Sequence, residues 1–389
     1  MTRRFDLVLY GATGFTGGLV ADYLAGVSAK ENLRWALAGR NPDKLQQVLA
    51  RIKAVPGAMI PEIIEADAGN AASLREMAQS TTAIITTVGP YMRFGEPLVA
   101  ACADAGTHYV DLTGEPAFTE KMRAKYQGRA AATGARIINS CGFESIPPDI
   151  AVLAAVNELR RRLGSRIAST DVVVKGATEG FSLPSGGTWH SAVGAMASAR
   201  EWLRDRPKPI KDNVRALNTP VLRNSDWECW ALNAPTIDPE VVRHSARVRA
   251  DYGRNFTYGH FVANKNPFAL AGMVVGLSGV FALAQFEPTR NWLLKQRQPG
   301  DGPDAATREK GWFNMHVTAE GGGEKVVLRM SGGDPFYGDT AKMIAEAGLA
   351  LALEKDLPEA AGVITPASGI GEVLVPRLTR AGLRFEILP

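Results

Sequence analysis

Hydrophobic and polar positions alternate in a regular way through the first 140 residues. Short apolar runs predict six strands, at residues 5–10, 35–38, 62–65, 83–88, 109–112 and 135–139. The segments between them carry helical spacing, at residues 18–25, 42–52, 73–79, 97–105 and 118–132. Strict alternation of strand and helix predicts an α/β domain of the Rossmann type, with a doubly wound parallel sheet.

The pattern changes after Pro147 and Pro148, which suit the first turn of a helix over residues 149–163. Beyond it the chain predicts strands at 169–175, 312–318 and 325–330, the last two joined by a glycine-rich turn. Residues 207–224 are polar and marked by proline, which predicts a loop or arm. This region therefore predicts a second domain of the α+β class with an antiparallel sheet.

The tail returns to helical spacing. Asp339 is predicted as the N-cap of a helix over 340–353, and Thr365–Pro366 as the start of a last helix that ends before Gly382. We expect the C-terminal helices to pack back on the first domain. The predicted divisions are residues 1–150, residues 151–338 for substrate and dimerisation, and residues 339–389 returning to the first domain.

Composition narrows the classes of function. The 389 residues are 46% hydrophobic and 22% charged, with a net charge of +4. No dense stripe of Lys and Arg is present, so we expect no nucleic-acid partner. Cys102, Cys141 and Cys229 have neither disulfide nor zinc spacing, and the five histidines are scattered, so we expect no metal site. The start of the chain lacks the pattern of a signal peptide, and we expect a cytoplasmic protein.

Residues 268–286 contain no charged side chain. The stretch is nearly long enough to cross a bilayer, which takes about 20 residues. Gly272, Gly276 and Gly279 give it a face of small residues. Three interpretations stay open: a buried helix or subunit interface, an interfacial helix, and a membrane span. The corresponding expectations are a homodimer and a peripheral membrane contact through 268–286.

Three glycines follow the first predicted strand and open a helix. Gly11 permits a tight turn, Gly14 lets a pyrophosphate approach the backbone, and Gly17 lets the helix pack closely on the strand. The helix N-terminus adds N–H groups and the positive end of the helix dipole. A dinucleotide is therefore predicted to contact this turn, through Gly11, Thr13, Gly14, Phe15, Thr16 and Gly17.

The end of the second strand selects the nicotinamide cofactor. NAD-binding chains usually place an acidic residue there, whereas this chain has Arg40. A guanidinium fits a 2′-phosphate, so NADP(H) is predicted. Asp67, after the third strand, is placed either to meet the adenine end or to hold a turn.

Residues after the fourth strand are predicted to line the ligand edge of the sheet. Gly89 and Pro90 would shape a wall beside the nicotinamide ribose. Tyr91 would either face the reacting carbon or pack in the core. Glu144, after the sixth strand, would either bind the cofactor or cap the following helix.

Several motifs together resemble the saccharopine dehydrogenase-like oxidoreductases. The resemblance runs nearly end to end, through the glycine turn, Ala38-Gly39-Arg40, Gly89-Pro90-Tyr91, the run from Tyr109 to Glu115, the run from Cys141 to Asp149, Ser185-Gly186-Gly187-Thr188, Gly332-Gly333-Asp334-Pro335, Tyr337-Gly338 and Thr365-Pro366. Within that family the chain is similar to the trans-acting enoyl reductases of mycobacterial lipid synthesis and their bacterial relatives.

The resemblance implies a Rossmann domain, a second α/β domain and NADP(H). In the enoyl reductases it implies reduction of a carbon–carbon double bond in a fatty acyl or polyketide chain held on a synthase, so that a carrier protein would present the substrate. Such a reaction needs a proton and hydrogen-bond donors for an enolate. The candidate catalytic residues are Tyr91, Ser185, Thr188 and His190.

Other functions remain open on the residues alone. Short-chain dehydrogenases use a Tyr followed four residues later by Lys, and Tyr91, Tyr109 and Tyr126 all lack that lysine. A reductase of an imine or another small substrate, as in saccharopine dehydrogenases, would want several arginines that bind carboxylates. A non-catalytic NADP-binding sensor would keep the cofactor site without turnover.

Overall fold

A computed structural model describes the chain except for residues 1–2, 182–185, 206–211, 234–236 and 297–301. The chain divides into two compact units, and each is described by itself. Unit 1 comprises Met1–Ile146 and Phe336–Leu383. Unit 2 comprises Pro147–Pro335 and Arg384–Pro389.

Unit 1 is built on a parallel sheet of seven strands in the order β14-β6-β5-β4-β1-β2-β3. Strand β1 pairs with both β2 and β4, so the strand order reverses beside it. This arrangement confirms the predicted doubly wound sheet. The strands are β1 (Phe5–Tyr10), β2 (Trp35–Gly39), β3 (Glu62–Glu65), β4 (Thr81–Thr86), β5 (His108–Val110), β6 (Arg136–Ile138) and β14 (Gly362–Ile364).

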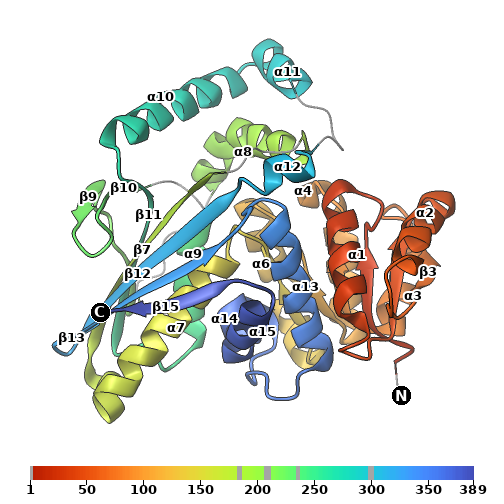
Figure 1. Cartoon of the computed structure of the whole chain (residues 1–389), viewed down its shortest axis with the longest axis horizontal. Coiled ribbons are helices and arrows are strands. Elements are labelled where there is room, and N and C mark those ends of the chain that lie inside the picture. Colours follow the sequence, from red (N-terminus) through yellow and green to blue (C-terminus); the bar gives the residue numbers. More distant parts are fainter. Residues whose placement is uncertain (1–2, 182–185, 206–211, 234–236, 297–301) are drawn as a thin grey trace. The chain divides into compact units, whose positions relative to one another are not determined.

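Helices cover the sheet of unit 1, and the central strands are buried because both of their faces are packed (Figure 1). Side chains cap two of these helices: Asn41 accepts a hydrogen bond at the start of α2, and Asn70 does the same at α3. The helices from the first half of the chain are α1 (Phe15–Ser28), α2 (Pro42–Lys53), α3 (Ala71–Ser80), α4 (Tyr91–Phe94), α5 (Glu96–Ala105) and α6 (Pro116–Thr133).

The tail completes unit 1. Helix α13 (Gly338–Leu353) packs so closely on the sheet that a Cβ at Gly348 would lie 2.5 Å from Ile85. The predicted N-cap is wrong: Tyr337 precedes the helix, and Asp339 lies inside its first turn, where it accepts a hydrogen bond from Lys342.

The predicted last helix is interrupted. It consists of α14 (Pro366–Gly369), the 3-10 turn η2 (Gly371–Val373) and α15 (Leu374–Arg380). Gly371 has a φ of 70°, a left-handed conformation that stops a regular helix.

A buried arginine ties these tail helices to the rest of unit 1. Arg377, 3% exposed, donates to the carboxylates of Glu346, Glu354 and Glu31 at 2.6–2.9 Å. The other oxygen of Glu346 accepts from the hydroxyl of Tyr23 at 2.6 Å. The network therefore joins α1, α13 and α15.

Unit 2 is built on a second sheet, with the strand order β15-β13-β12-β7-β11-β10-β9 and β8 beside β11. The sheet is mixed rather than purely antiparallel, because β11 runs parallel to β7 and β8. Its strands are β7 (Asp171–Phe181), β8 (Val214–Ala216), β9 (Val221–Asn224), β10 (Cys229–Asn233), β11 (Asn255–Asn264), β12 (Trp312–Gly321), β13 (Glu324–Gly332) and β15 (Arg384–Leu388).

Two predictions fail in this unit. Residues 207–224 were predicted as a loop or arm, yet β8 and β9 both lie within that range. The segment 339–389 was predicted to return to the first domain; residues up to Leu383 lie in unit 1, whereas β15 pairs antiparallel with β13 of unit 2. All three strands are short, and pairing with neighbouring strands rather than a strong apolar pattern holds them.

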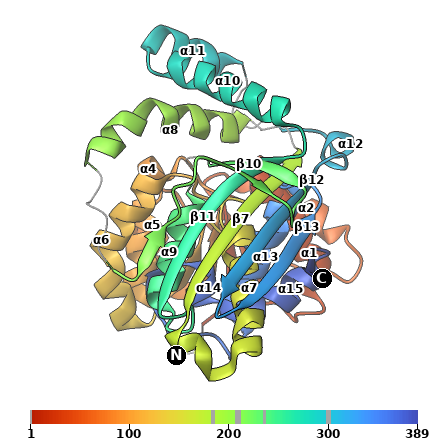
Figure 2. The same cartoon turned by 90° about the vertical axis from the view of Figure 1, so that its left-hand side faces the viewer.

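The helices of unit 2 include a layer formed by α8, α10 and α11, which contact one another (Figures 1 and 2). The helices are α7 (Ile146–Leu163), η1 (Gly164–Ser169), α8 (Gly186–Asp205), α9 (Asp238–Val248), α10 (Pro267–Ala284), α11 (Glu287–Lys295) and α12 (Ala305–Arg308).

Candidate functional site

The glycine turn between β1 and α1 requires two of its glycines for purely structural reasons. Gly11 has a φ of 94°, which side chains rarely adopt. A Cβ at Gly17 would lie 2.1 Å from the carbonyl oxygen of Gly11, so any larger residue would push helix and strand apart. Gly14 is different: its φ is −77°, and an added Cβ would meet only the Gly11 oxygen at 3.5 Å.

The fold alone therefore does not demand a glycine at position 14. The residue is exposed and forms the N-cap of α1, a position where a side chain that accepts a hydrogen bond normally stabilises the helix. No side chain caps α1, and its first turn holds no acidic residue. The backbone donors and the positive end of the helix dipole thus suit an anion, and a pyrophosphate fits this cradle.

Arg40 and Asp67 lie near the ends of β2 and β3, close to Tyr10. The side chain of Arg40 is exposed and, among the described residues, has no hydrogen bond or ion pair. Burial, together with the charge of Asp67, raises the pKa of Tyr10 to about 12, and the charge of Arg40 opposes this rise. A guanidinium held in the open beside the phosphate turn fits a 2′-phosphate. Asp67 accepts from the amide of Gly69 at 2.7 Å, which gives it a turn-forming role.

Tyr91 occupies the core. Its hydroxyl donates to the carbonyl of Thr86 and accepts from the amide of Leu112, both at 3.2 Å, and its ring packs against Phe118. Burial raises its pKa well above the ordinary value. The geometry favours the packing interpretation, because the backbone already engages the hydroxyl.

Gly89 and Pro90, joined by a cis peptide bond, are exposed directly after β4. The turn that follows is held by Glu115, which accepts from the amides of Tyr91 and Met92 at 3.0 and 3.1 Å. These residues lie beside the point where the strand order reverses, at the edge where such sheets bind ligands.

Two carboxyl groups follow β5 and β6 at this same edge. Asp111 is fully buried, and burial raises its pKa to about 6, although it accepts four hydrogen bonds, from Tyr109, Thr113, Asn139 and Ser140. Burial raises the pKa of Glu144 to about 7, and the charge of Asp111 adds to the rise. The Oε2 atom of Glu144 is enclosed and has no hydrogen-bond partner in the described part of the chain.

From the sequence, Glu144 was predicted only as a cofactor contact or a helix cap. A carboxyl that is half protonated near neutral pH and has an unsatisfied oxygen is instead a candidate acid. Its position after a strand was visible in the sequence, but its enclosure was not, since Thr340, from a distant segment, packs against the turn that carries Glu144.

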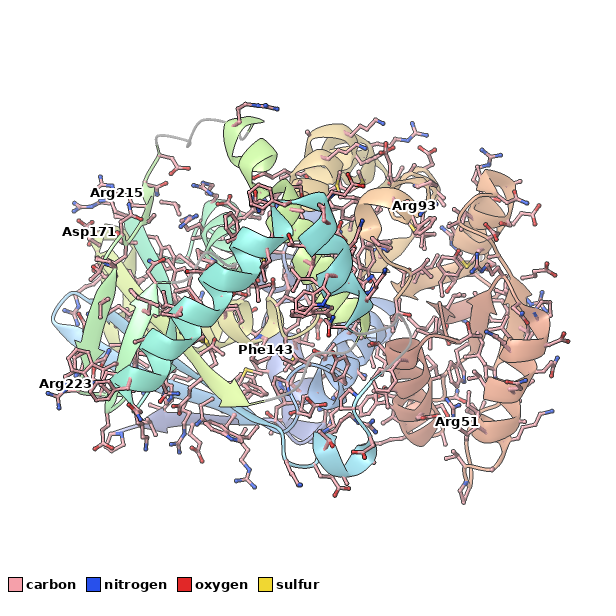
Figure 3. All side chains as sticks on the ribbon, turned by 90° about the horizontal axis from the view of Figure 1, so that it is seen from above. Arg51, Arg93, Phe143, Asp171, Arg215 and Arg223 are labelled. Atoms are coloured by element: carbon pink, nitrogen blue, oxygen red, sulfur yellow. The ribbon has the colours of Figure 1, made fainter. Side chains whose placement is uncertain are left out.

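A row of aromatic rings runs along the same edge. Phe15 packs on Tyr337 at 5.3 Å, Tyr337 on Phe336 at 6.3 Å, and Phe336 on Phe143 at 6.1 Å between ring centroids. Phe143 is labelled in Figure 3. The tail thus contributes Phe336 and Tyr337 to the surroundings of the phosphate turn, which the sequence signalled only as the motif Tyr337-Gly338.

The remaining candidates belong to unit 2. Ser185 lies outside the described residues, and so does the side chain of Thr188. His190 is half-buried in α8, and its Nε2 lies 2.9 Å from the carbonyl oxygen of Leu294 in α11. That contact links two helices, so His190 has a structural role.

Unit 2 also contains a pocket of about 420 Å³ at the ends of β7, β11 and β12. It is lined by Glu179, Gly180, Asn264, Lys265, Trp312 and Asn314. A hydrogen bond from His316 lowers the pKa of Glu179. Among the described residues, no group of three or more His, Cys, Asp or Glu side chains could hold a metal ion.

Comparison with known proteins agrees with this geometry. The family model of the saccharopine dehydrogenase NADP binding domain matches residues 7–138. A solved structure of apo saccharopine dehydrogenase (L-Glu forming) from Saccharomyces cerevisiae shares the fold, with a TM-score of 0.53 over 98% of this chain and 99% of that chain, at 13% identity. The fold and the phosphate turn define an NADP-dependent oxidoreductase of the saccharopine dehydrogenase type, and its cofactor is NADP(H).

The similarity to named relatives extends over both units. A trans-acting enoyl reductase of Mycobacterium ulcerans is 35% identical over 98% of this chain and 97% of its own length. A Mycobacterium tuberculosis protein provisionally named as a trans-acting enoyl reductase is 37% identical, over 99% and 97%. The chain belongs to the family of trans-acting enoyl reductases.

Proposed function

We propose that this oxidoreductase reduces a carbon–carbon double bond conjugated to the carbonyl of a fatty acyl or polyketide thioester, presented by a carrier protein. The observation that carries the proposal is the extent of the similarity. At 35–37% identity it covers 97% of each named relative, and so includes unit 2 as well as the nucleotide-binding unit. Similarity confined to the phosphate turn would favour any NADP-dependent reaction equally.

The chain's own contribution begins with binding. The turn at Gly11, Gly14 and Gly17 would hold the pyrophosphate, and Arg40 would bind the 2′-phosphate. Gly89 and Pro90 would border the nicotinamide. NADPH, when bound, supplies a hydride for the β-carbon of the substrate.

Glu144 is the group best suited to supply the proton. Addition of a hydride at the β-carbon leaves an enolate, which must take a proton at the α-carbon. With a pKa of about 7, the carboxyl of Glu144 holds a proton on a large share of the molecules at neutral pH and can release it without a large barrier. In this step the Glu144 O–H bond breaks, the α-carbon C–H bond forms, and solvent then reprotonates the carboxylate.

The four candidates from the sequence enter the proposal differently. Tyr91 and His190 would act only if they gave up the contacts described above. Ser185 and Thr188 stay predictions for the hydrogen bond to the thioester oxygen. Asp111 is unsuited as the donor because four hydrogen bonds hold its two oxygens.

The test is turnover of enoyl thioesters of several chain lengths, measured as the loss of NADPH fluorescence. Wild type should consume NADPH with at least one of them, and Glu144→Gln should bind NADPH normally but lower kcat by roughly 100-fold or more. Ser145→Ala, next to Glu144 in the chain, serves as the matched control. No turnover with any thioester, together with tight NADPH binding, would overturn the proposal and favour a sensor, whereas turnover of an imine alone would favour an imine reductase.

A further inference from the structure

Helix α10 is apolar on every side yet exposed. It spans Pro267–Ala284, with a mean hydropathy of 2.0, and only 11% of it is buried. A helix with this composition is normally found inside a protein or a membrane, because water solvates its side chains poorly. Viewed from above, α10 and α11 face the reader and no other element of unit 2 lies in front of them (Figure 3).

Only a narrow stripe of α10 faces its own unit. Leu270 and Ala284 are buried, whereas Phe268 is 84% exposed and Val275 is 73% exposed. The three glycines of the helix point into open space, since an added Cβ at Gly272, Gly276 or Gly279 would meet nothing within 4 Å. The outer face of α10, defined by Phe268, Val274, Val275, Leu277 and Leu283, is therefore not covered by any residue that the structure describes.

The helix is nevertheless held in place. Ala284 of α10 packs in a small apolar cluster with Val193 of α8 and Leu293 of α11. The side chain of Gln285 donates to the carbonyl of Met196 at 2.8 Å, and the indole of Trp189 donates to the carbonyl of Leu293 at 2.6 Å. The three helices thus form a supported layer whose outer face needs another partner.

The charges at the two ends of α10 indicate what that partner is. From residue 264 to residue 296 the charged side chains are Lys265, Glu287, Arg290 and Lys295, a surplus of cations that lie only outside the apolar stretch. Aromatic side chains lie near both ends: Phe268, Phe286 at 67% exposed and Trp292 at 55%. Apolar surface bordered by aromatic rings and cations matches the boundary between lipid chains and anionic headgroups.

The topology of unit 2 excludes a single crossing of the bilayer. Strand β11 enters α10 and strand β12 follows the helical layer, yet both strands pair with β7 in one sheet. A crossing by α10 would require a second crossing before β12. Helix α11 has nine residues, about 14 Å in length, and the bilayer core is about 30 Å thick. On a bilayer, helix α10 would therefore lie in the plane of the membrane surface rather than across it.

We propose that the outer face of α10, with the cations and aromatic residues at its ends, docks unit 2 on the surface of an anionic lipid bilayer. A second copy of the chain fits less well, because Glu287 is the only carboxylate across 264–296 and most cations would face cations in a symmetric pair. The proposal is independent of the reaction that the protein catalyses.

Flotation of the full chain with phospholipid vesicles tests it. Wild type should float with vesicles that contain phosphatidylglycerol and much less with phosphatidylcholine alone. Val275→Asp should lower the bound fraction by at least about tenfold, since it places a charge among lipid chains. Ile60→Asp is the matched control: Ile60 is 50% exposed in unit 1, and its variant should float like wild type. NADPH binding and circular dichroism would verify that each variant is folded.

Two further measurements keep the test decisive. Lys265→Gln combined with Lys295→Gln should remove the preference for anionic vesicles. Brominated lipids should quench the tryptophan fluorescence of wild type more strongly than that of Trp292→Phe. Equal flotation of wild type and Val275→Asp would overturn the proposal. The proposal would also be overturned if the wild-type protein bound neither kind of vesicle but formed a dimer in sedimentation experiments, and the Val275→Asp variant did not. The partner of α10 would then be a second copy of the chain.

Discussion

Replacement of Gly14 by serine separates the two reasons for which a glycine can occupy the phosphate turn. The backbone at Gly14 has an ordinary φ of −77°, and a Cβ there would lie 3.5 Å from the nearest protein atom, the carbonyl oxygen of Gly11. Serine is also a favourable N-cap residue, which helix α1 lacks. The free energy of unfolding of Gly14→Ser should therefore stay within a few tenths of a kcal/mol of wild type or rise.

The affinity for NADPH should fall instead. The added side chain would occupy the space through which a pyrophosphate reaches the backbone N–H groups of α1. A hydrogen bond to a charged group contributes about 1.5–3 kcal/mol, and displacement of the phosphate would lose one such bond and weaken another. The expected loss is about 3 kcal/mol, which corresponds to a roughly 100-fold higher Kd.

Fluorescence titration with NADPH and urea unfolding, on the same preparations, measure the two quantities. Gly17→Ala is the contrast, because its Cβ would lie 2.1 Å from the Gly11 oxygen and the fold itself should lose stability. An unchanged Kd for Gly14→Ser would refute the assignment of the turn as a phosphate cradle. A loss of stability as large as that of Gly17→Ala would refute the steric argument.

Three further outcomes can be measured. Arg40→Ala should raise the Kd for NADPH by roughly 10- to 30-fold in fluorescence titration and leave that for NADH unchanged, since the guanidinium would contact only the 2′-phosphate; an equal effect on both would exclude this role. Arg377→Met should lower the free energy of unfolding in urea by about 3–5 kcal/mol, because it leaves the buried carboxylate of Glu346 without its charged partner. Arg129→Met, at an exposed ion pair, should lower the free energy of unfolding by at most about 1 kcal/mol. Burial raises the pKa of Glu144 from 4.5 to about 7, so the folded state keeps this proton to higher pH than the unfolded chain does. The contribution of the protonated Glu144 carboxyl to the free energy of unfolding is therefore full below about pH 4.5 and declines as the pH rises toward 7. Glu144→Gln should flatten that decline in unfolding experiments across this pH range, and an unchanged slope would contradict the assigned burial.

The fold could be predicted from the sequence wherever hydrophobic and polar residues follow the period of a strand or a helix. The strands of unit 1 are short apolar runs and its helices have clear spacing, so six strands of the sheet were predicted with small errors at their ends. Edge strands lack that signal: β8, β9 and β15 are held mainly by their neighbours in the sheet. The break in the last helix was missed because the left-handed φ of Gly371 is visible only in the structure.

The candidate site shows the same division. The glycine turn and Arg40 form a contiguous motif with a known mechanism, and the sequence alone predicted both. The enclosed carboxyl of Glu144 and the ring of Tyr337 against Phe15 depend on segments about 200 and 320 residues away, and no spacing in the chain connects them. The network of Arg377 was missed for the same reason, since its three carboxylate partners lie on α13, at the end of α13 and just after α1.

The tail of the chain supplies indispensable parts to both units. Strand β14 forms one edge of the first sheet, helix α13 packs on that sheet, and β15 forms one edge of the second sheet. During synthesis, neither unit can reach its final structure until residues 336–389 have left the ribosome tunnel. A prematurely terminated chain would consequently expose two unfinished cores at once, and quality-control proteases should remove such fragments rather than leave a half-working enzyme in the cell.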